Sequence, residues 1–193
     1  MTNIYILAGK SASGKDTLLK QIVDCTDAEP IISNTTRPMR PNEIDGVEYD
    51  FMDKAEFDTY EYIEQREYQT LVNGIEDTWY YGTPVENFDF NSDKTYVGIL
   101  DLQGYCKLYE YIITHGIQAN LRLFYVWADE KTRTERAKQR LGFDETEWNR
   151  RLQDDNLKFQ SLSGLNPTLN FKYIYNFSTL EEAFEQYKKY IND

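Results

Sequence analysis

Short apolar runs alternate with stretches of helical character along most of this chain of 193 residues. Apolar runs bounded by polar or turn residues predict four buried strands, at residues 3–8, 95–100, 121–128 and 172–176. Helices are predicted between and after them, at residues 15–25, 103–114, 130–140, 146–159 and 180–191. Strands separated by helices indicate an α/β fold with a mostly parallel sheet covered by helices on both faces.

Residues 31–90 have a different character, being rich in Tyr, Glu and Asp and in turn signals such as Asp45-Gly46 and Asn73-Gly74. The single longer helix expected there covers Ala55–Arg66. This composition predicts an inserted lobe of short strands at 33–90, carried by a core made of 1–32 and 91–193.

The composition narrows the choice of partners and compartment. Hydrophobic residues make up 40% of the chain and charged residues 28%, as in ordinary globular proteins, and the net charge is −12. So acidic a chain is a poor partner for nucleic acid or anionic membrane, both of which need a basic surface. Cys25 and Cys106 form no metal-binding spacing. We therefore expect a cytoplasmic monomer or homodimer that binds small molecules.

A first candidate site lies in the segment AGKSASGKDTL, residues 8–18, which nearly matches G-x-x-x-x-G-K-[ST]. It follows a predicted strand and opens a predicted helix, as a phosphate-binding loop requires. Backbone N–H groups and the helix N-terminus would bind phosphates, and the lysine would neutralise the transferred group. The alternative is a glycine-rich turn with a surface lysine. The candidate ATP-binding residues are Gly9, Ser11, Ser13, Gly14, Lys15, Asp16 and Thr17.

A second candidate site lies in SNTTRPMRPNEIDGVEYDF, residues 33–51. Arg37 and Arg40 lie three positions apart beside the hydroxyl residues Ser33, Thr35 and Thr36. The planar fork of arginine suits a phosphate because it donates two hydrogen bonds at once. The segment therefore predicts a local anion site in an acidic protein. The alternative is that these are solvated surface arginines in a proline-rich loop.

This second segment resembles the nucleotide-binding region of guanylate kinases, S-x-T-T-R-x-x-R-x-x-E-x-x-G-x-x-Y-x-F, at every specified position. Residues 79–83, WYYGT, resemble the family's N-Y-Y-G-[ST], and 101–104, DLQG, resemble D-x-Q-G. Arg136-x-x-x-Arg140, with Arg151 downstream, resembles the arginines of the family's lid. The resemblance runs from Ile4 to about Phe184 and implies a P-loop kinase fold with an inserted nucleotide lobe and a helical lid.

The resemblance also implies roles for the acceptor nucleotide. The acceptor phosphate would bind Arg37, Arg40, Tyr49 and Tyr81. Guanine would be read by Ser33, Thr83, Asp101 and a glutamate, taken here as Glu67 with Glu64 as the alternative. A carboxylate suits this task because guanine offers the N1–H and N2–H₂ donors side by side, whereas adenine leaves such an acceptor unpaired.

The resemblance implies a lid at about 136–155, where Arg136, Arg140 and Arg151 close over the phosphates and exclude water. Together with Lys15 and Arg37 they would act by positioning and charge neutralisation, with ATP as co-substrate and Mg²⁺ as cofactor. Asn176 would border the adenine pocket. Without the resemblance, these lid arginines read as ordinary charge on an exposed helix.

Two departures from the family pattern stand out. Asp16 replaces the usual Ser or Thr of the phosphate loop, and we expect it to hold Mg²⁺ through its carboxylate. The segment Ile75–Trp79 lengthens the connection before Tyr80, as a loop beside the base pocket. Within it, Trp79 is expected to pack into the small core of the lobe.

Three functions remain open on the sequence alone. The first is a kinase of GMP or dGMP, and the second is a related kinase of another phosphorylated acceptor, such as a modified nucleotide or ribose 1,5-bisphosphate. The third is a non-enzymatic binding module of the same fold. The first requires Lys15, Arg37, Arg40 and the lid arginines to converge on one cleft. His115 is expected to be a surface residue that ends a helix.

Overall fold

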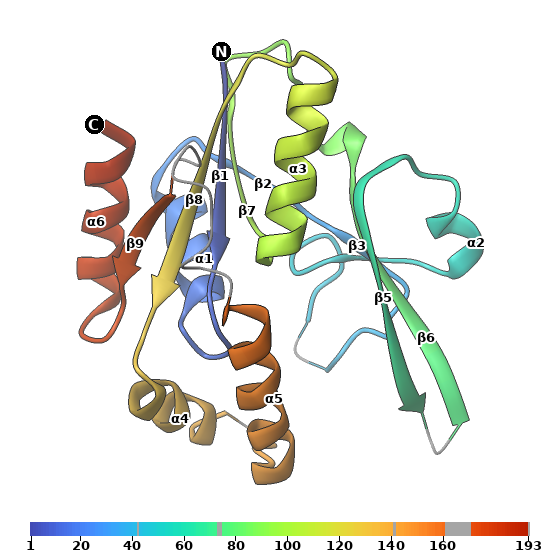
Figure 1. The fold of residues 1–193 in the computed structure, drawn as a ribbon, viewed down its shortest axis with the longest axis vertical. Helices are drawn as coiled ribbons and strands as arrows, with labels where there is room; N and C mark the ends of the chain where they lie inside the picture. Colours follow the sequence, from blue (N-terminus) through green and yellow to red (C-terminus); the bar gives the residue numbers. More distant parts are fainter. Residues whose placement is uncertain (42, 73–74, 141, 161–170, 193) are drawn as a thin grey trace.

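The computed structural model describes residues 1–41, 43–72, 75–140, 142–160 and 171–192. Its larger sheet has five parallel strands. In spatial order these are β2 (Glu29–Pro30), β7 (Thr95–Ile99), β1 (Thr2–Ala8), β8 (Ala119–Trp127) and β9 (Phe171–Tyr175). The strands run away from the N-terminus towards the end of the molecule at which the candidate phosphate loop lies (Figure 1).

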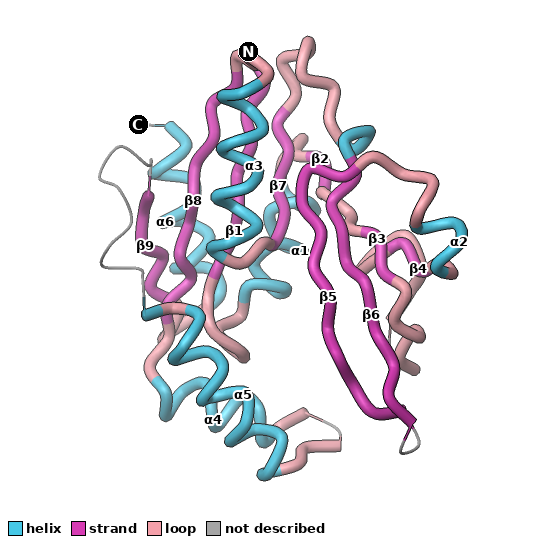
Figure 2. Tube along the Cα trace, turned by 45° about the vertical axis from the view of Figure 1, so that its right-hand side comes forward, coloured by secondary structure: helices cyan, strands magenta, loops and turns pink. Residues whose placement is uncertain are grey.

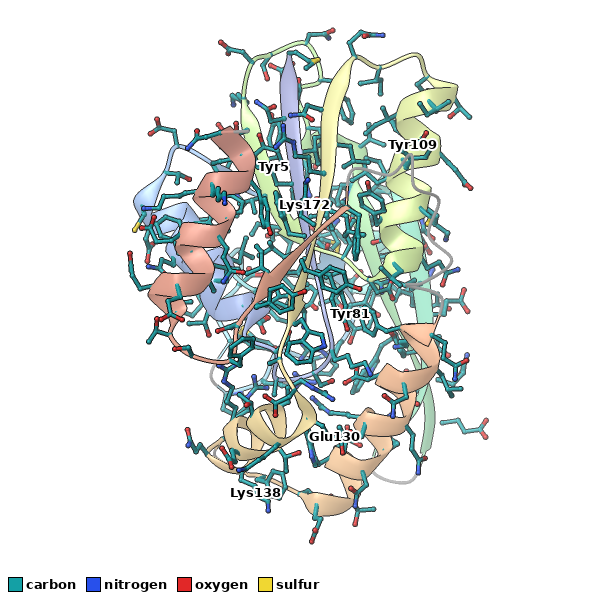
Figure 3. The ribbon with its side chains drawn as sticks, turned by 60° about the vertical axis from the view of Figure 1, so that its left-hand side comes forward. Tyr5, Tyr81, Tyr109, Glu130, Lys138 and Lys172 are labelled. Atoms are coloured by element: carbon teal, nitrogen blue, oxygen red, sulfur yellow. The ribbon has the colours of Figure 1, made fainter. Side chains whose placement is uncertain are left out.

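Helices cover both faces of this sheet, which confirms the predicted α/β fold (Figure 1). One face carries α1 (Lys15–Cys25) and α6 (Leu180–Asn192), and the other carries α3 (Leu102–Thr114). The alternation of side chains in β1 explains the two cores, since successive residues of a strand point to opposite faces. Ile4 and Ile6 pack on the α3 side, whereas Tyr5, labelled in Figure 3, and Leu7 pack on the side of α1 and α6. There Tyr5 meets Tyr187 edge to face.

A second, mixed sheet forms the inserted lobe. Its spatial order is β4 (Asp50–Phe51), β3 (Asn34–Thr35), β6 (Ile75–Pro84) and β5 (Tyr62–Val72). The last two strands are antiparallel and form a long hairpin that extends away from the five-stranded sheet (Figure 2). The turn expected at Asn73-Gly74 lies outside the described residues.

Two predictions about this lobe were wrong. The helix expected over Ala55–Arg66 is only α2 (Lys54–Phe57), and the following residues enter β5. The segment Ile75–Trp79 is not a loop, because it is the first half of β6 and pairs with β5. Cross-strand pairing therefore outweighs the helix propensity of residues such as Glu64 and Gln65, which sit in the strand. A short 3₁₀ helix, η1 (Val85–Asn87), then leads out of the hairpin.

Two further helices lie beyond the C-terminal end of the parallel strands (Figure 1). They are α4 (Glu130–Lys138) and α5 (Glu145–Lys158), and Arg140 therefore follows the end of α4 rather than lying inside the helix. His115 caps the C-terminus of α3 as an exposed residue, with Nδ1 2.8 Å from the carbonyl oxygen of Tyr111. Among the described helices, none has the length and apolar character needed to cross a membrane.

Candidate active site

The candidate phosphate loop connects β1 to α1, and two glycines are required by its shape. A Cβ on Gly9 would lie 2.4 Å from the carbonyl oxygen of Val126 in the neighbouring strand. Gly14 has φ of +93°, in the left-handed region that favours glycine, and its Cβ would meet the side chain of Asn176 at 2.3 Å. The loop therefore follows a tight path at the carboxyl end of the central strand, where ligands of parallel sheets bind.

The loop is held from outside by Asn176 and Arg136. Asn176 Nδ2 donates to the carbonyl oxygen of Ser13 at 2.8 Å, and Arg136 Nη1 donates to the same oxygen at 3.2 Å. Arg136 Nη2 also donates to Asn176 Oδ1 at 3.4 Å. The two predicted ligand-binding residues thus contact the loop backbone in this structure. The buried hydroxyl of Ser13 has no hydrogen-bond partner among the described residues.

A buried ion pair between α4 and α5 binds the other side of the loop. Asp155 Oδ2 accepts the backbone N–H of Ser11 at 2.8 Å and lies 3.3 Å from Arg133 Nη1. Arg133 Nη1 also donates to the carbonyl oxygen of Ser11 at 3.2 Å. We call these three residues the loop clasp. Neither Arg133 nor Asp155 was predicted from the sequence, because no local motif connects two residues 22 positions apart.

Lys15 lies in the first turn of α1, half-buried at the mouth of the loop. Burial lowers its pKa below the ordinary lysine value, while the carboxylates of Asp16 and Asp155 oppose this shift. The positive charges of Arg140 and Arg133 lower the pKa further, so Arg140 acts electrostatically on this group. Asp16 and Thr17 are exposed in the same turn. The loop therefore presents a partly desolvated cation flanked by a carboxylate and a hydroxyl.

A cavity of about 780 Å³ opens beside Lys15 and is walled by three separate parts of the fold. The phosphate loop contributes Gly9, Ser11 and Lys15, and the inserted lobe contributes Tyr49 and Tyr81. Residues of α5 form much of the remaining wall. Its predicted residues are Gly9, Ser11, Lys15, Arg40, Tyr49, Tyr81, Asp101 and Arg151. Tyr81, labelled in Figure 3, lines this cavity from β6. Lys15, Arg40 and Arg151 therefore converge on one cleft, whereas Arg37, Arg136 and Arg140 are not among its described walls.

Arg37 lies behind the cavity wall instead of in it. Its side chain is 3% exposed and forms a two-pronged ion pair with Glu43, with nitrogen–oxygen distances of 2.9 and 2.8 Å. The guanidinium also lies over the rings of Tyr49 and Phe51, 5.5 and 5.3 Å from their centroids. Glu43, which the sequence showed only as a motif position, thus fixes the orientation of Arg37.

Aromatic residues of the hairpin form one side of the cavity. Tyr81 meets Tyr49 and Tyr68 edge to face, with centroid distances of 5.7 and 5.4 Å. Trp79 also lines the cavity, and its Nε1 donates to Asp77 at 3.1 Å. The expectation that Trp79 packs into the core of the lobe was wrong, because the residue pairs with Tyr68 on the face of the hairpin that points to the cavity.

The hydroxyls of Ser33 and Thr83 lead to a buried glutamate. Thr83 Oγ1 lies 3.1 Å from Ser33 Oγ and donates to Glu64 Oε1 at 2.9 Å. Glu64 pairs with Thr83 across the hairpin, whereas Glu67 pairs with Tyr80. Directly opposed residues share a face, and Glu67 is therefore on the face opposite to Glu64. Glu67 does not join this network, and the alternative prediction, Glu64, fits the geometry.

Asp101 completes this end of the site from a different element. It caps the N-terminus of α3, where Oδ1 accepts the N–H of Gly104 at 2.9 Å, and Oδ2 accepts from Arg66 of β5. Arg66, Tyr68, Asp101 and Lys158 also line an adjoining cavity of about 670 Å³, and so both cavities meet at this carboxylate. Nothing in the sequence motifs singled out Arg66.

Charged residues of α5 form the last wall. Arg151 donates to Glu147 at 2.8 Å, and the neighbouring Arg150 binds the same carboxylate at 2.7 Å. Hydrogen bonds from Arg150, followed by those from Arg151, lower the pKa of Glu147 to about 2. Both arginines line the cavity and are about half exposed. They are therefore within reach of an anion that enters the cleft.

Comparisons with known proteins show the family of this chain. The sequence profile of the family described as guanylate kinase matches residues 1–193. A guanylate kinase of Legionella pneumophila is 45% identical over 56 residues, or 28% of this chain and 27% of that protein. A guanylate kinase of Sulfurimonas denitrificans is 35% identical over 104 residues, or 52% of this chain and 48% of that protein. The matched segments thus span at most about half the length of these relatives.

A solved structure resembles the whole fold. The crystal structure of a guanylate kinase from Anaplasma phagocytophilum superposes with a TM-score of 0.65 over 99% of this chain and 85% of that chain. The sequence identity is 20%, and the likeness therefore supports the fold alone.

Proposed function

Because this chain belongs to the guanylate kinase family, we propose that it transfers the γ-phosphoryl group of ATP to GMP or dGMP. The products are then ADP and GDP or dGDP. One observation carries the proposal: Lys15 of the phosphate loop, Arg40 of the lobe and Asp101 at the base end line a single cavity. A cavity of about 780 Å³ is in the range of nucleotide-sized sites.

The donor nucleotide binds with its phosphates in the loop. The N–H groups of residues 9–15 and the N-terminus of α1 provide positive field, and Lys15 neutralises charge on the transferred group. Asn176 and Arg136 hold the carbonyl oxygen of Ser13, which keeps the loop in its binding shape. Asn176 also borders the adenine. The buried Ser13 hydroxyl on the same loop has no hydrogen-bond partner within the described part of the chain.

The acceptor nucleotide lies across the lobe. Its phosphate contacts Arg40, Tyr49 and Tyr81, with Arg37 reaching it from behind when the pair with Glu43 opens. Its base meets the network of Ser33, Thr83 and Glu64, together with Asp101. In place of Glu67, we assign the reading of the guanine N1–H and N2–H₂ donors to Glu64.

The lid supplies the remaining charge. We infer that residues 136–155 move as a lid on a core of 1–32 and 91–193, with 33–90 as the acceptor lobe. Closure brings Arg136, Arg140 and Arg151 onto the phosphates and excludes water from the reaction. No protein nucleophile is needed, because phosphoryl transfer through a loose transition state depends on positioning and charge.

Mg²⁺ fits the residues at the start of α1. It often binds through one or two carboxylates together with substrate phosphates, and it prefers oxygen ligands. Asp16 offers such a carboxylate in the turn that holds Lys15, with the Thr17 hydroxyl beside it. When bound, the ion supplies charge neutralisation at the phosphates. We assign the reaction to the reducing cytoplasm, in line with the two free thiols of Cys25 and Cys106.

The test is ATP- and Mg²⁺-dependent phosphorylation of GMP, dGMP, AMP, dAMP, CMP, UMP, dTMP and ribose 1,5-bisphosphate. Turnover confined to GMP or dGMP supports the proposal. Lys15→Ala is expected to lower kcat by about 10³-fold or more, since it removes a charge that acts on the transition state. Lys20→Ala, an exposed lysine of the same helix, serves as the matched control. Wild-type protein that leaves both guanine nucleotides unchanged contradicts the proposal.

A further inference from the structure

Arg66 occupies the space between the two carboxylates of the proposed base site. Its Nε lies 3.2 Å from Glu64 Oε2, and its Nη1 donates to Asp101 Oδ2. The side chain is 23% exposed and lines both cavities that meet at Asp101. The guanidinium therefore stands where an incoming base would have to approach Glu64.

The carboxylate of Glu64 has no free surface in this arrangement. Its side chain is 1% exposed, and Oε1 already accepts from Thr83. Oε2 is fully buried and receives no hydrogen bond from the described residues, because Arg66 Nε lies at ion-pair distance without hydrogen-bond geometry. A base can therefore reach Oε2 only if the guanidinium moves away. A buried carboxylate oxygen that accepts no hydrogen bond costs free energy, and a ligand that donates one removes this cost.

The guanidinium and the guanine edge carry the same chemistry. Arginine presents adjacent planar N–H donors, and guanine presents N1–H and N2–H₂ in the same relation. Resting on the proposed function, we propose that Arg66 is a specificity-determining residue that competes with the guanine edge for Glu64 and Asp101. Through these two contacts, Arg66 acts as an internal substitute for the base.

This competition has a predictable effect on selectivity. Every base that uses Glu64 must first displace Arg66. The apparent affinity for the base is therefore the intrinsic affinity multiplied by the fraction of protein in which Arg66 has moved away from Glu64. The Arg66 side chain is 23% exposed, so the displaced charge can turn towards water, which limits the penalty of leaving an ion unpaired. A ligand that binds through its phosphate alone makes no use of Glu64 and avoids the penalty. Arg66 therefore weakens guanine binding selectively.

The alternative role of Arg66 is purely structural, as the counter-ion that holds two carboxylates together. The two roles predict opposite changes on truncation. Competition predicts that Arg66→Ala binds GMP more tightly, whereas a structural counter-ion predicts weaker binding or loss of the fold.

The experiment measures kcat and KM for GMP in wild type, Arg66→Ala and Arg66→Gln, with thermal unfolding as the check of folding. We expect KM for GMP to fall about tenfold in both variants with kcat within about twofold. The inhibition constant of ribose 5-phosphate, which has no base, stays unchanged. Lys107→Ala is the matched control, because Lys107 contacts the backbone of Gln65 from outside the pocket and its loss leaves KM unchanged.

The outcomes separate this inference from the proposed function. A KM for GMP that is unchanged or raised in folded variants overturns the role of Arg66 and leaves the proposed function standing. Turnover of GMP by Arg66→Ala but not by wild type supports the role of Arg66 and overturns guanine as the natural acceptor. Absence of GMP turnover in all the proteins overturns both.

Discussion

Glu64 and Glu67 show how strongly a single residue's role depends on the face it occupies. Both lie in β5, yet Glu64 is buried against Thr83 whereas Glu67 is exposed opposite Tyr80. Period-two alternation groups Glu64 with Arg66 and Tyr68, all of which face the cavity side of the hairpin. A helix over Ala55–Arg66 hides this grouping, because helical spacing does not place alternate residues on one face.

Replacing Glu64 by Gln should separate the two glutamates. The amide turns one acceptor into a donor that faces the N–H groups of guanine, and the loss of one charged hydrogen bond is worth about 1.5–3 kcal/mol. We expect kcat/KM for GMP to fall by about 100-fold, with KM for ATP unchanged. Glu67→Gln is the matched control and should stay within about twofold. Steady-state kinetics with equal losses in the two variants would contradict the assignment of Glu64.

At the scale of elements, the phosphate loop depends on helices far from it in the chain. The loop clasp ties Ser11 to Arg133 of α4 and Asp155 of α5, and Lys10 Nζ adds a bond to Asn156 at 2.6 Å. The strands and helices flanking this loop were predictable, because their patterns are local. The clasp was not, since burial and pairing across 22 residues leave no periodic signal.

Breaking the clasp should destabilise the fold. In Asp155→Ala, Arg133 becomes a buried charge without its partner. Removing one partner of a buried ion pair typically lowers the free energy of unfolding by about 3–5 kcal/mol. We expect a loss of about 3 kcal/mol or more in the free energy of unfolding, measured by urea denaturation. Asp154→Ala removes the neighbouring exposed carboxylate, whose pair with Arg150 is worth at most about 1 kcal/mol. Equal losses in both variants would refute a buried clasp.

For the molecule as a whole, the order of strands and helices was readable, but the meeting of distant parts was not. The family resemblance predicted that Lys15, Arg37, Arg40 and the lid arginines share a cleft, and the cavity brings together Lys15, Arg40 and Arg151. The resemblance gave no hint that Glu43 would sequester Arg37. Nor did it indicate that Arg66 would contact both its near neighbour Glu64 and Asp101, which lies 35 positions further along the chain. Such pairings arise from tertiary packing, which sets the partners of a charge only after the fold has formed.

The three-part construction of the cavity predicts closure on binding. Loop, hairpin and α5 form its walls from separate elements, and a ligand that contacts all three gains most when they approach. GMP together with a non-hydrolysable ATP analogue should therefore lower the radius of gyration in X-ray scattering and change tryptophan emission. Trp79 lines the cavity, whereas Trp127 lies at the exposed end of β8.

Two variants test the share of the signal that comes from the cavity, while the third tryptophan, Trp148 of α5, is present in both. Trp79→Phe should remove most of the emission change, and Trp127→Phe, the matched control, should retain it because its ring packs against Tyr175 and Phe177 instead of the cavity wall. Either ligand alone should give a smaller change in radius than the pair, because it contacts fewer of the three walls. A radius that is the same with and without both ligands would mean that the cleft is already in its working shape, and closure would then have no part in excluding water.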